Sequence, residues 1–170
     1  MWQKYQLKVS KNNIVIREIK AEDDAQVAAV IRDVLIEFGV PKVGTAYEDT
    51  ALDCMTETYN ALNMVYYVLD DHGKIIGGAG IAPLEGEDHV CELQKMYFLP
   101  EARGTGLGSA MMTKCLEKAK ELGFKKCYLE TLPYMKAATK LYGKVGFAPL
   151  EAPMGNTGHY SCNVWMIKEL

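Results

Sequence analysis

The chain has 170 residues, with 19 Lys and Arg against 22 Asp and Glu, so its formal net charge is −3. Hydrophobic residues make up 49% and charged residues 24%, a composition that excludes a disordered or collagen-like chain. The length fits a single domain, residues 1–170, and the mildly acidic balance argues against a nucleic-acid partner.

The N-terminal sequence and the cysteines indicate where in the cell the protein is expected and whether it is cross-linked or binds a metal. Residues 1–5 (MWQKY) lack the apolar stretch of a secretory signal, and no run approaches the roughly 18 apolar residues that span a bilayer. We therefore expect a cytoplasmic protein with no membrane partner. The five cysteines are scattered without a C-x-x-C pair, so neither a disulfide framework nor a metal site is predicted.

In chain order, the first half of the sequence predicts a strand, two helices and a hairpin. Apolar side chains at spacings of three and four indicate the helices, and Gly39 ends the first of them. The tetrapeptide Asp-Asp-His-Gly at 70–73 is a turn signal between two apolar runs. The predicted elements are a strand at 14–19, helices at 22–38 and 50–62 separated by a loop at 41–49, and strands at 64–69 and 74–82.

The second half of the sequence alternates strands and helices. Pro100 stops one strand, and Gly123 ends the longest helix of this half. The whole order indicates a mixed α/β sheet with helices on both faces. The predicted elements are a strand at 90–98, a helix at 107–122, a strand at 124–131, a helix at 135–144, a short strand opening at 146–147 and a last strand at 159–167.

A glycine-rich loop joins the strand at 90–98 to the helix that follows. Its alternating glycines leave main-chain N–H groups unshielded, and the start of a helix adds a partial positive charge at the same place. The loop therefore predicts a bound anion such as a phosphate. Its residues are Arg103, Gly104, Thr105, Gly106, Leu107, Gly108 and Ser109.

Several interpretations of this loop compete. A dinucleotide fingerprint that starts at Gly104 reaches Ser109 where its last glycine belongs, although Glu130 lies where a ribose-binding acid could fall. A P-loop would need a lysine that is absent, and a glycine-rich turn without a ligand remains open. The pattern R-x-x-G-x-G fits completely from Arg103 to Gly108.

A second pattern accompanies the loop. Residues 138–147 read A-x-x-L-Y-x-K-x-G-F, and the two patterns together resemble those of the GNAT N-acetyltransferase superfamily. The resemblance implies an α/β fold with a mixed, mostly antiparallel sheet of about seven strands, splayed fourth and fifth strands, and helices on both faces. It also implies an acyltransferase that uses acetyl-CoA as co-substrate and needs no metal.

The resemblance assigns cofactor contacts to three places in the chain. Main-chain groups at the end of the strand at 90–98 would pair with the pantetheine amides, and the loop amides would hold the pyrophosphate. The thioester would enter the gap between the splayed strands. The residues implied are Met96, Tyr97 and Phe98, the loop Arg103 to Ser109, Thr131 and Ala138.

Two residues are expected to carry the chemistry. The family's tyrosine corresponds to Tyr142, which would act as general acid toward the coenzyme sulfur, and the main-chain amide near Tyr97 would stabilise the oxyanion. An amine nucleophile must lose a proton, and Glu92 is the expected base. His159, Glu130 or a water chain are the alternatives. No cysteine lies in either pattern, so direct attack in a ternary complex is expected.

The acceptor is expected to be a small-molecule or peptide amine. In this family the loops corresponding to 38–49 and 149–160 would select it, and relatives often form homodimers. A non-catalytic acetyl-CoA sensor and an O-acyltransferase are the alternative functions. A mildly acidic mouth for a cationic amine is predicted from Glu37, Tyr47, Glu48 and Asp49, with Glu92 in the gap.

Overall fold

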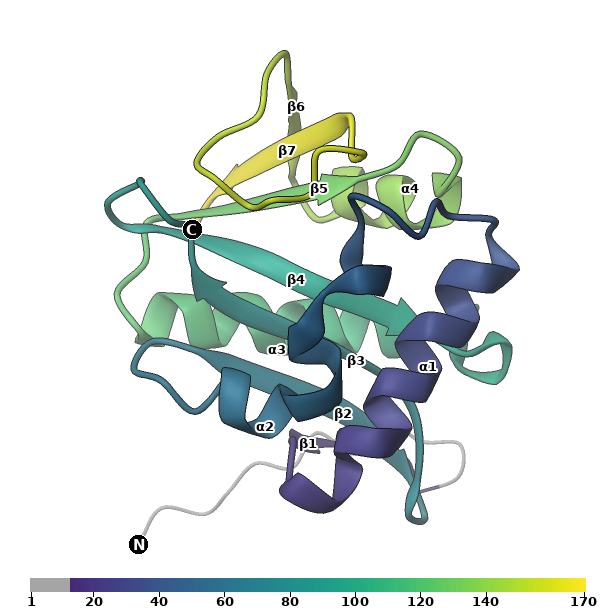
Figure 1. Cartoon of the computed structure of the whole chain (residues 1–170). Coiled ribbons are helices and arrows are strands. Elements are labelled where there is room, and N and C mark those ends of the chain that lie inside the picture. Colours follow the sequence, from purple (N-terminus) through teal and green to yellow (C-terminus); the bar gives the residue numbers. More distant parts are fainter. Residues whose placement is uncertain (1–12) are drawn as a thin grey trace, which may run out of the picture.

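The computed structural model describes residues 13–170 of the chain (Figure 1). The statement about a secretory signal at residues 1–5 therefore lies outside the described residues. Within residues 13–170, no helix combines the length and the apolar character that crossing a membrane requires.

One sheet organises the described part of the chain, and its strand order is β1-β2-β3-β4-β5-β7-β6. Its strands are β1 (Val15–Glu18), β2 (Val65–Asp71), β3 (Lys74–Pro83), β4 (Val90–Phe98), β5 (Lys126–Thr131), β6 (Ala148–Leu150) and β7 (Val164–Glu169). The helices are α1 (Asp24–Glu37), α2 (Met55–Thr58), α3 (Leu107–Glu121) and α4 (Lys136–Lys144), with short 3-10 turns η1 (Ala21–Asp23), η2 (Ala46–Glu48), η3 (Thr50–Cys54) and η4 (Pro100–Ala102).

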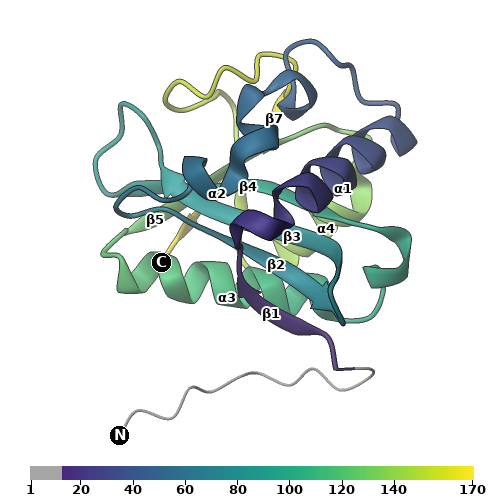
Figure 2. The same cartoon turned by 60° about the horizontal axis from the view of Figure 1, so that its bottom comes forward.

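The sheet is mixed, and helices cover both of its faces. Strands β4 and β5 run parallel, whereas the other neighbouring strands are antiparallel. Figure 2 shows α1 and α2 on one face and α3 on the other. Separate hydrophobic clusters lie under each layer, with Leu35 and Met55 in one and Met111 and Tyr142 in the other. The predicted fold class is confirmed.

Two predicted elements are wrong in extent. The helix expected at 50–62 is a 3-10 turn followed by the single turn α2, because Asn60 and Asn63 are poor helix formers and Asn63 takes a left-handed conformation, with φ +63°. The strand expected at 159–167 begins only at Val164. Before it the chain turns, since the Cys162 amide donates to the His159 carbonyl, so His159 lies in a loop.

Strands β4 and β5 separate along their length. Their paired residues are confined to Val90–Glu92 against Lys126–Tyr128. Beyond Glu92 no strand in the described part of the chain covers the β5 side of β4. The splay of the fourth and fifth strands, which the sequence resemblance implies, is therefore present.

A bulge in β4 contributes to this separation. Lys95 has φ +50°, and the β3–β4 register shifts between Gly78 and Gly80. The Tyr66 hydroxyl donates to the Lys95 carbonyl at 2.9 Å and holds the bulge in place. A Cβ at either glycine would lie 2.7 Å from the Tyr66 ring, so the small residues of β3 admit the tyrosine that supports the site.

Candidate active site

The gap between β4 and β5 opens into two adjoining cavities. The inner pocket includes Glu92, Lys95, Glu130, Thr131, His159 and Cys162 in its lining. The outer groove includes Val34, Phe38, Phe98, Arg103, Gly104, Gly108 and Leu141. The residues that line both cavities are Met96, Tyr97, Met135, Ala138 and Tyr142. Because these residues are shared, a molecule lying in the outer groove reaches the inner pocket at Tyr142.

The glycine loop leads from η4 into α3 at one end of the outer groove. Gly104 and Gly106 have φ +68° and +85°, and no atom lies within 4 Å of where a Cβ would stand on either. Gly106 is the N-cap of α3, so the first amides of this helix face open space. Leu107 differs from the rest of the loop, because its side chain is buried in the core.

If this loop holds the coenzyme pyrophosphate, as the sequence resemblance implies, a methyl group at Gly106 should weaken coenzyme binding. The Gly106→Ala protein is expected to show at least a tenfold higher KM for acetyl-CoA, because the left-handed φ of +85° is strained for alanine and relief of this strain would move the loop amides. Gly86 is the matched control, since it has φ +86° and equally open surroundings in the β3–β4 turn. Steady-state kinetics of both variants check this, and equal KM values would contradict the phosphate site.

Arg103 connects this loop to α1. Its Nε donates to the Phe98 carbonyl at 2.9 Å, and both terminal nitrogens donate to the Glu37 carboxylate at 2.8 Å. The guanidinium also lies over the Phe38 ring, 5.0 Å from its centroid. The expectation that Glu37 belongs to an acidic acceptor mouth is therefore wrong, because its charge is paired beside the outer groove.

Tyr142 lies on α4 where the two cavities meet. It is 6% exposed and packs edge-on against Phe147, with ring centroids 6.0 Å apart. Burial raises the pKa of its hydroxyl well above the usual value, with a smaller contribution from Cys127. The group is thus a neutral phenol at pH 7 and a hydrogen-bond donor. Thr131, at the end of β5, is similarly buried in the wall of the inner pocket.

Glu92 is a buried carboxylate on β4. Its Oε2 accepts from Gln94 Nε2 at 2.7 Å, and the Tyr59 hydroxyl donates to Gln94 Oε1 at 2.6 Å, so the amide orientation is fixed. Burial raises the pKa of Glu92 to about 7; the Gln94 hydrogen bond opposes this and the charge of Glu130 adds to it. Glu92 therefore titrates where a general base is most effective.

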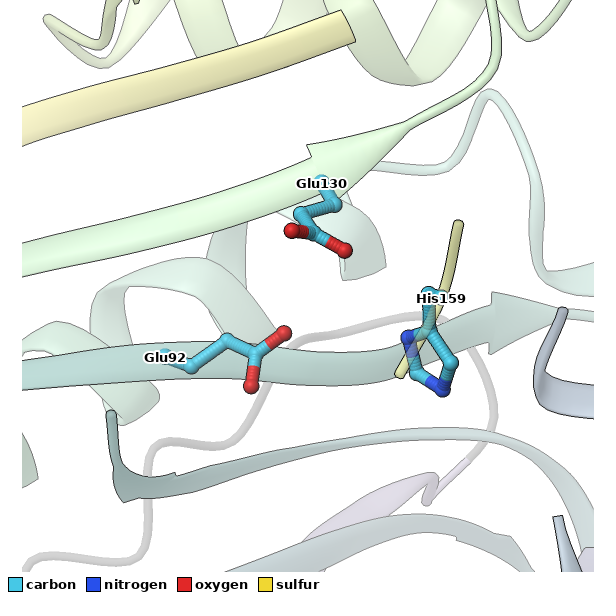
Figure 3. A group of neighbouring side chains, drawn as sticks. All are labelled: Glu92, Glu130 and His159. Carbon is cyan, nitrogen blue, oxygen red and sulfur yellow. The ribbon is translucent and has the colours of Figure 1, made fainter. Parts of the chain in front are cut away.

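Glu130 and His159 lie beside Glu92 in the inner pocket. Figure 3 shows the three side chains gathered from β4, β5 and the loop before β7. One ligand atom from each lies within 4.8 Å of the others, so this group has the proximity to hold a metal ion. Tyr128 and Thr157 donate hydroxyl hydrogen bonds to the two oxygens of Glu130, each at 2.7 Å.

A partly buried ion pair lies beside the pocket, and one member of it, Lys95, belongs to the lining. Lys95 Nζ lies 2.9 Å from Asp49 Oδ2, which in turn lies 4.0 Å from His159 Nε2. Burial alone would raise the pKa of Asp49, but Lys95 and the Ala51 amide lower it below the usual value. Burial, assisted by the charge of Lys95, lowers the pKa of His159. The imidazole is neutral at pH 7, and the charge of Asp49 is already compensated.

The acidic character of the pocket comes from the strands and not from the expected loop residues. Tyr47 and Glu48 are absent from the lining of both cavities, and Glu48 is exposed. Glu92 and Glu130 supply the carboxylates instead. The loops at 38–49 and 149–160 come together, because the amide of Ser161, directly after the second loop, donates to the Gly44 carbonyl at 3.1 Å.

Sequence reasoning missed several supporting side chains. Gln94 and Tyr128 lie two residues from Glu92 and Glu130 on the same strands, a spacing that places side chains on one face and could have indicated them. Lys95 and Thr157 have no such signal, because a bulge and a loop bring them to the pocket.

Comparisons with known proteins identify the family of the chain. The acetyltransferase (GNAT) family matches residues 28–147. A relative from Escherichia coli K12, named as an uncharacterized N-acetyltransferase, YjgM, is 41% identical over 164 residues, which are 95% of this chain and 98% of the relative.

Solved structures show the same fold. A GNAT-family acetyltransferase from Staphylococcus aureus Mu50 superposes with a TM-score of 0.83 at 20% identity and covers 92% of this chain and 99% of its own. The putative acetyltransferase YncA from Salmonella typhimurium, solved with acetyl-CoA, has a TM-score of 0.75 at 18% identity and covers 94% and 95% of the two chains. From its sequence patterns, its fold and its relatives, the chain belongs to the GNAT family of acetyltransferases.

Proposed function

We propose that this acetyltransferase transfers an acetyl group from acetyl-CoA to a primary amine by direct attack in a ternary complex. One observation carries the proposal: a groove with a helix N-terminus at its end adjoins a pocket that contains the buried carboxylate of Glu92, and Tyr142 lines both. The structural likeness to the Salmonella protein solved with acetyl-CoA supports the choice of cofactor.

The coenzyme would lie in the outer groove. Its pyrophosphate would accept hydrogen bonds from the amides between Gly104 and Ser109, and its pantetheine amides would pair with the main chain of Met96 to Phe98 on the side of β4 that faces β5. This arrangement brings the thioester past Ala138 to the gap beside Thr131. Recognition then depends on main-chain groups, which side-chain substitution does not remove.

The chemistry would take place between the two cavities. Glu92 accepts a proton from the acceptor nitrogen, which attacks the thioester carbon. The main-chain amide at Tyr97 stabilises the resulting oxyanion. The carbon–sulfur bond then breaks, and the hydroxyl of Tyr142 donates to the thiolate as it leaves. The acceptor enters as an ammonium ion: one of its three protons goes to Glu92 and then to solvent, one ends on the coenzyme thiol, and one stays on the amide nitrogen.

A thermal-shift and turnover experiment tests this proposal. Acetyl-CoA at 100 times its Kd is expected to stabilise the fold by about 2.7 kcal/mol, whereas NADH at the same concentration gives no shift. A panel of primary amines with acetyl-CoA should release free thiol. Protection without thiol release from any amine would favour the sensor function, and release with alcohols alone would favour O-acyl transfer.

A further inference from the structure

We propose that Glu130 binds the acceptor amine as an ammonium ion, bridged between Glu130 and Glu92, so that the enzyme selects aliphatic amines over alcohols and aromatic amines. This inference rests on the proposed function and assigns the acceptor class. It follows from the charges in the inner pocket, the separations between their atoms, and the neutral donors that hold Glu130.

The inner pocket carries an anion without a paired cation. Asp49 is neutralised by Lys95 at 2.9 Å. Among residues 13–170, no lysine or arginine forms an ion pair with Glu130; its oxygens accept from the neutral hydroxyls of Tyr128 and Thr157 instead. Hydroxyl donors orient a carboxylate but do not compensate its charge. A cationic occupant would supply the missing charge.

The separations fit an ammonium ion. One ligand atom from each of Glu92, Glu130 and His159 lies within 4.8 Å of the others. Charge-assisted N–H···O bonds of about 2.7–2.9 Å let one nitrogen span oxygens up to about 5.6 Å apart. One ammonium nitrogen can therefore reach both carboxylates. The same proximity suits a metal ion, so Zn²⁺ is one arm of the test below.

The bridge explains how capture leads to reaction and release. The ammonium ion enters with three N–H bonds, of which one faces Glu130 and another faces Glu92. Transfer of one proton to Glu92 frees the nitrogen lone pair for attack on the thioester carbon. The product amide is neutral, so its attraction to Glu130 is lost. An alcohol or an aromatic amine is uncharged at pH 7 and gains nothing from Glu130.

Binding and kinetics of Glu130→Gln test the inference. Calorimetry with n-butylammonium chloride, added to the complex with coenzyme A, should show binding to the wild-type protein and at least tenfold weaker binding to the variant. In turnover, KM for alkylamines should rise at least tenfold while kcat at the optimal pH stays within about threefold. The control is Glu117→Gln, an exposed carboxylate of α3 that lines neither cavity.

Thr157 provides a second, milder test. Thr157→Val removes the hydroxyl that donates to Glu130, so KM for the amine should rise severalfold, whereas Thr157→Ser keeps the donor and should match the wild type. The pH profile is independent evidence, because loss of the Glu130 charge should move the acidic limb of kcat to lower pH.

The outcomes are distinguishable. The binding arm needs no turnover, so a protein that binds butylammonium through Glu130 without acetylating any amine supports the ammonium site and contradicts the proposed transfer. Amine turnover with an unchanged KM in Glu130→Gln overturns the inference and leaves the proposed function intact. Stoichiometric Zn²⁺ binding that requires His159 and Glu130, with no effect of Glu130→Gln on butylammonium binding, would assign the cluster to a metal instead.

Discussion

The Tyr142→Phe protein is expected to lose at least tenfold in kcat with little change in the KM for acetyl-CoA. Removal of one donor to a developing negative charge lowers rates by about 10²- to 10³-fold in well-studied sites. Burial raises the pKa of this phenol, so complete proton transfer to a thiolate is uphill. The hydroxyl therefore acts mainly by donating a hydrogen bond as the carbon–sulfur bond breaks.

Thiol release at saturating substrates measures this effect. Tyr67→Phe is a matched control, because Tyr67 is equally buried on β2 and lies outside the lining of both cavities. Phenylalanine fills the space of either tyrosine ring, so the free energies of unfolding of both variants should lie within about 1 kcal/mol of the wild-type value. If kcat of Tyr142→Phe lies within twofold of that of the control, the hydroxyl of Tyr142 does not take part in the reaction.

Glu92→Gln is expected to lower kcat by about 10²- to 10³-fold and to abolish the acidic limb of the pH profile. In the wild type, kcat should rise with pH through about 7, because the base must be ionised to accept a proton. If His159 is the base instead, Glu92→Gln keeps most of its activity and His159→Asn loses it. Initial rates between pH 5.5 and about 9 separate the two residues.

The same substitution should stabilise the fold at high pH. Folding raises the pKa of Glu92 from its ordinary value of 4.5 to about 7. Between these two pH values, the native state therefore binds more protons than the unfolded state. Stability from this group is therefore lost as pH rises through that interval. Above pH 7, the free energy of unfolding of Glu92→Gln should be up to about 3 kcal/mol higher than that of the wild type. Urea unfolding at low and high pH measures the difference.

Much of the fold follows from patterns in the sequence. Apolar spacing places α1, α3 and α4 to within a few residues, and strands β2, β3 and β4 start within one residue of their predicted positions. The two errors have different causes. Asn60 and Asn63 end the segment after Asp49 early, because asparagine is a poor helix former and Asn63 is left-handed. Before Val164, hydrogen bonds such as that from the Ser161 amide to the Gly44 carbonyl hold the chain in a loop.

The candidate site was predictable only where its residues follow local motifs. The glycine loop and Tyr142 come from contiguous patterns, whereas the pocket around Glu92 is assembled from four separate segments. His159 reaches it because the chain turns before β7, and Lys95 because a bulge reverses the expected direction of its side chain. No alternation of apolar residues encodes either event, because both depend on contacts distant in sequence.

The interrupted pairing between β4 and β5 has a consequence for the protein without its coenzyme. After Glu92, the side of β4 that faces β5 is a strand edge inside the sheet, because no strand in the described part of the chain pairs with it there. Exposed edges of this kind invite self-association in many proteins. The pantetheine arm would thus cover this edge as an added strand. Purified protein stored with coenzyme A should therefore self-associate more slowly than protein stored without it.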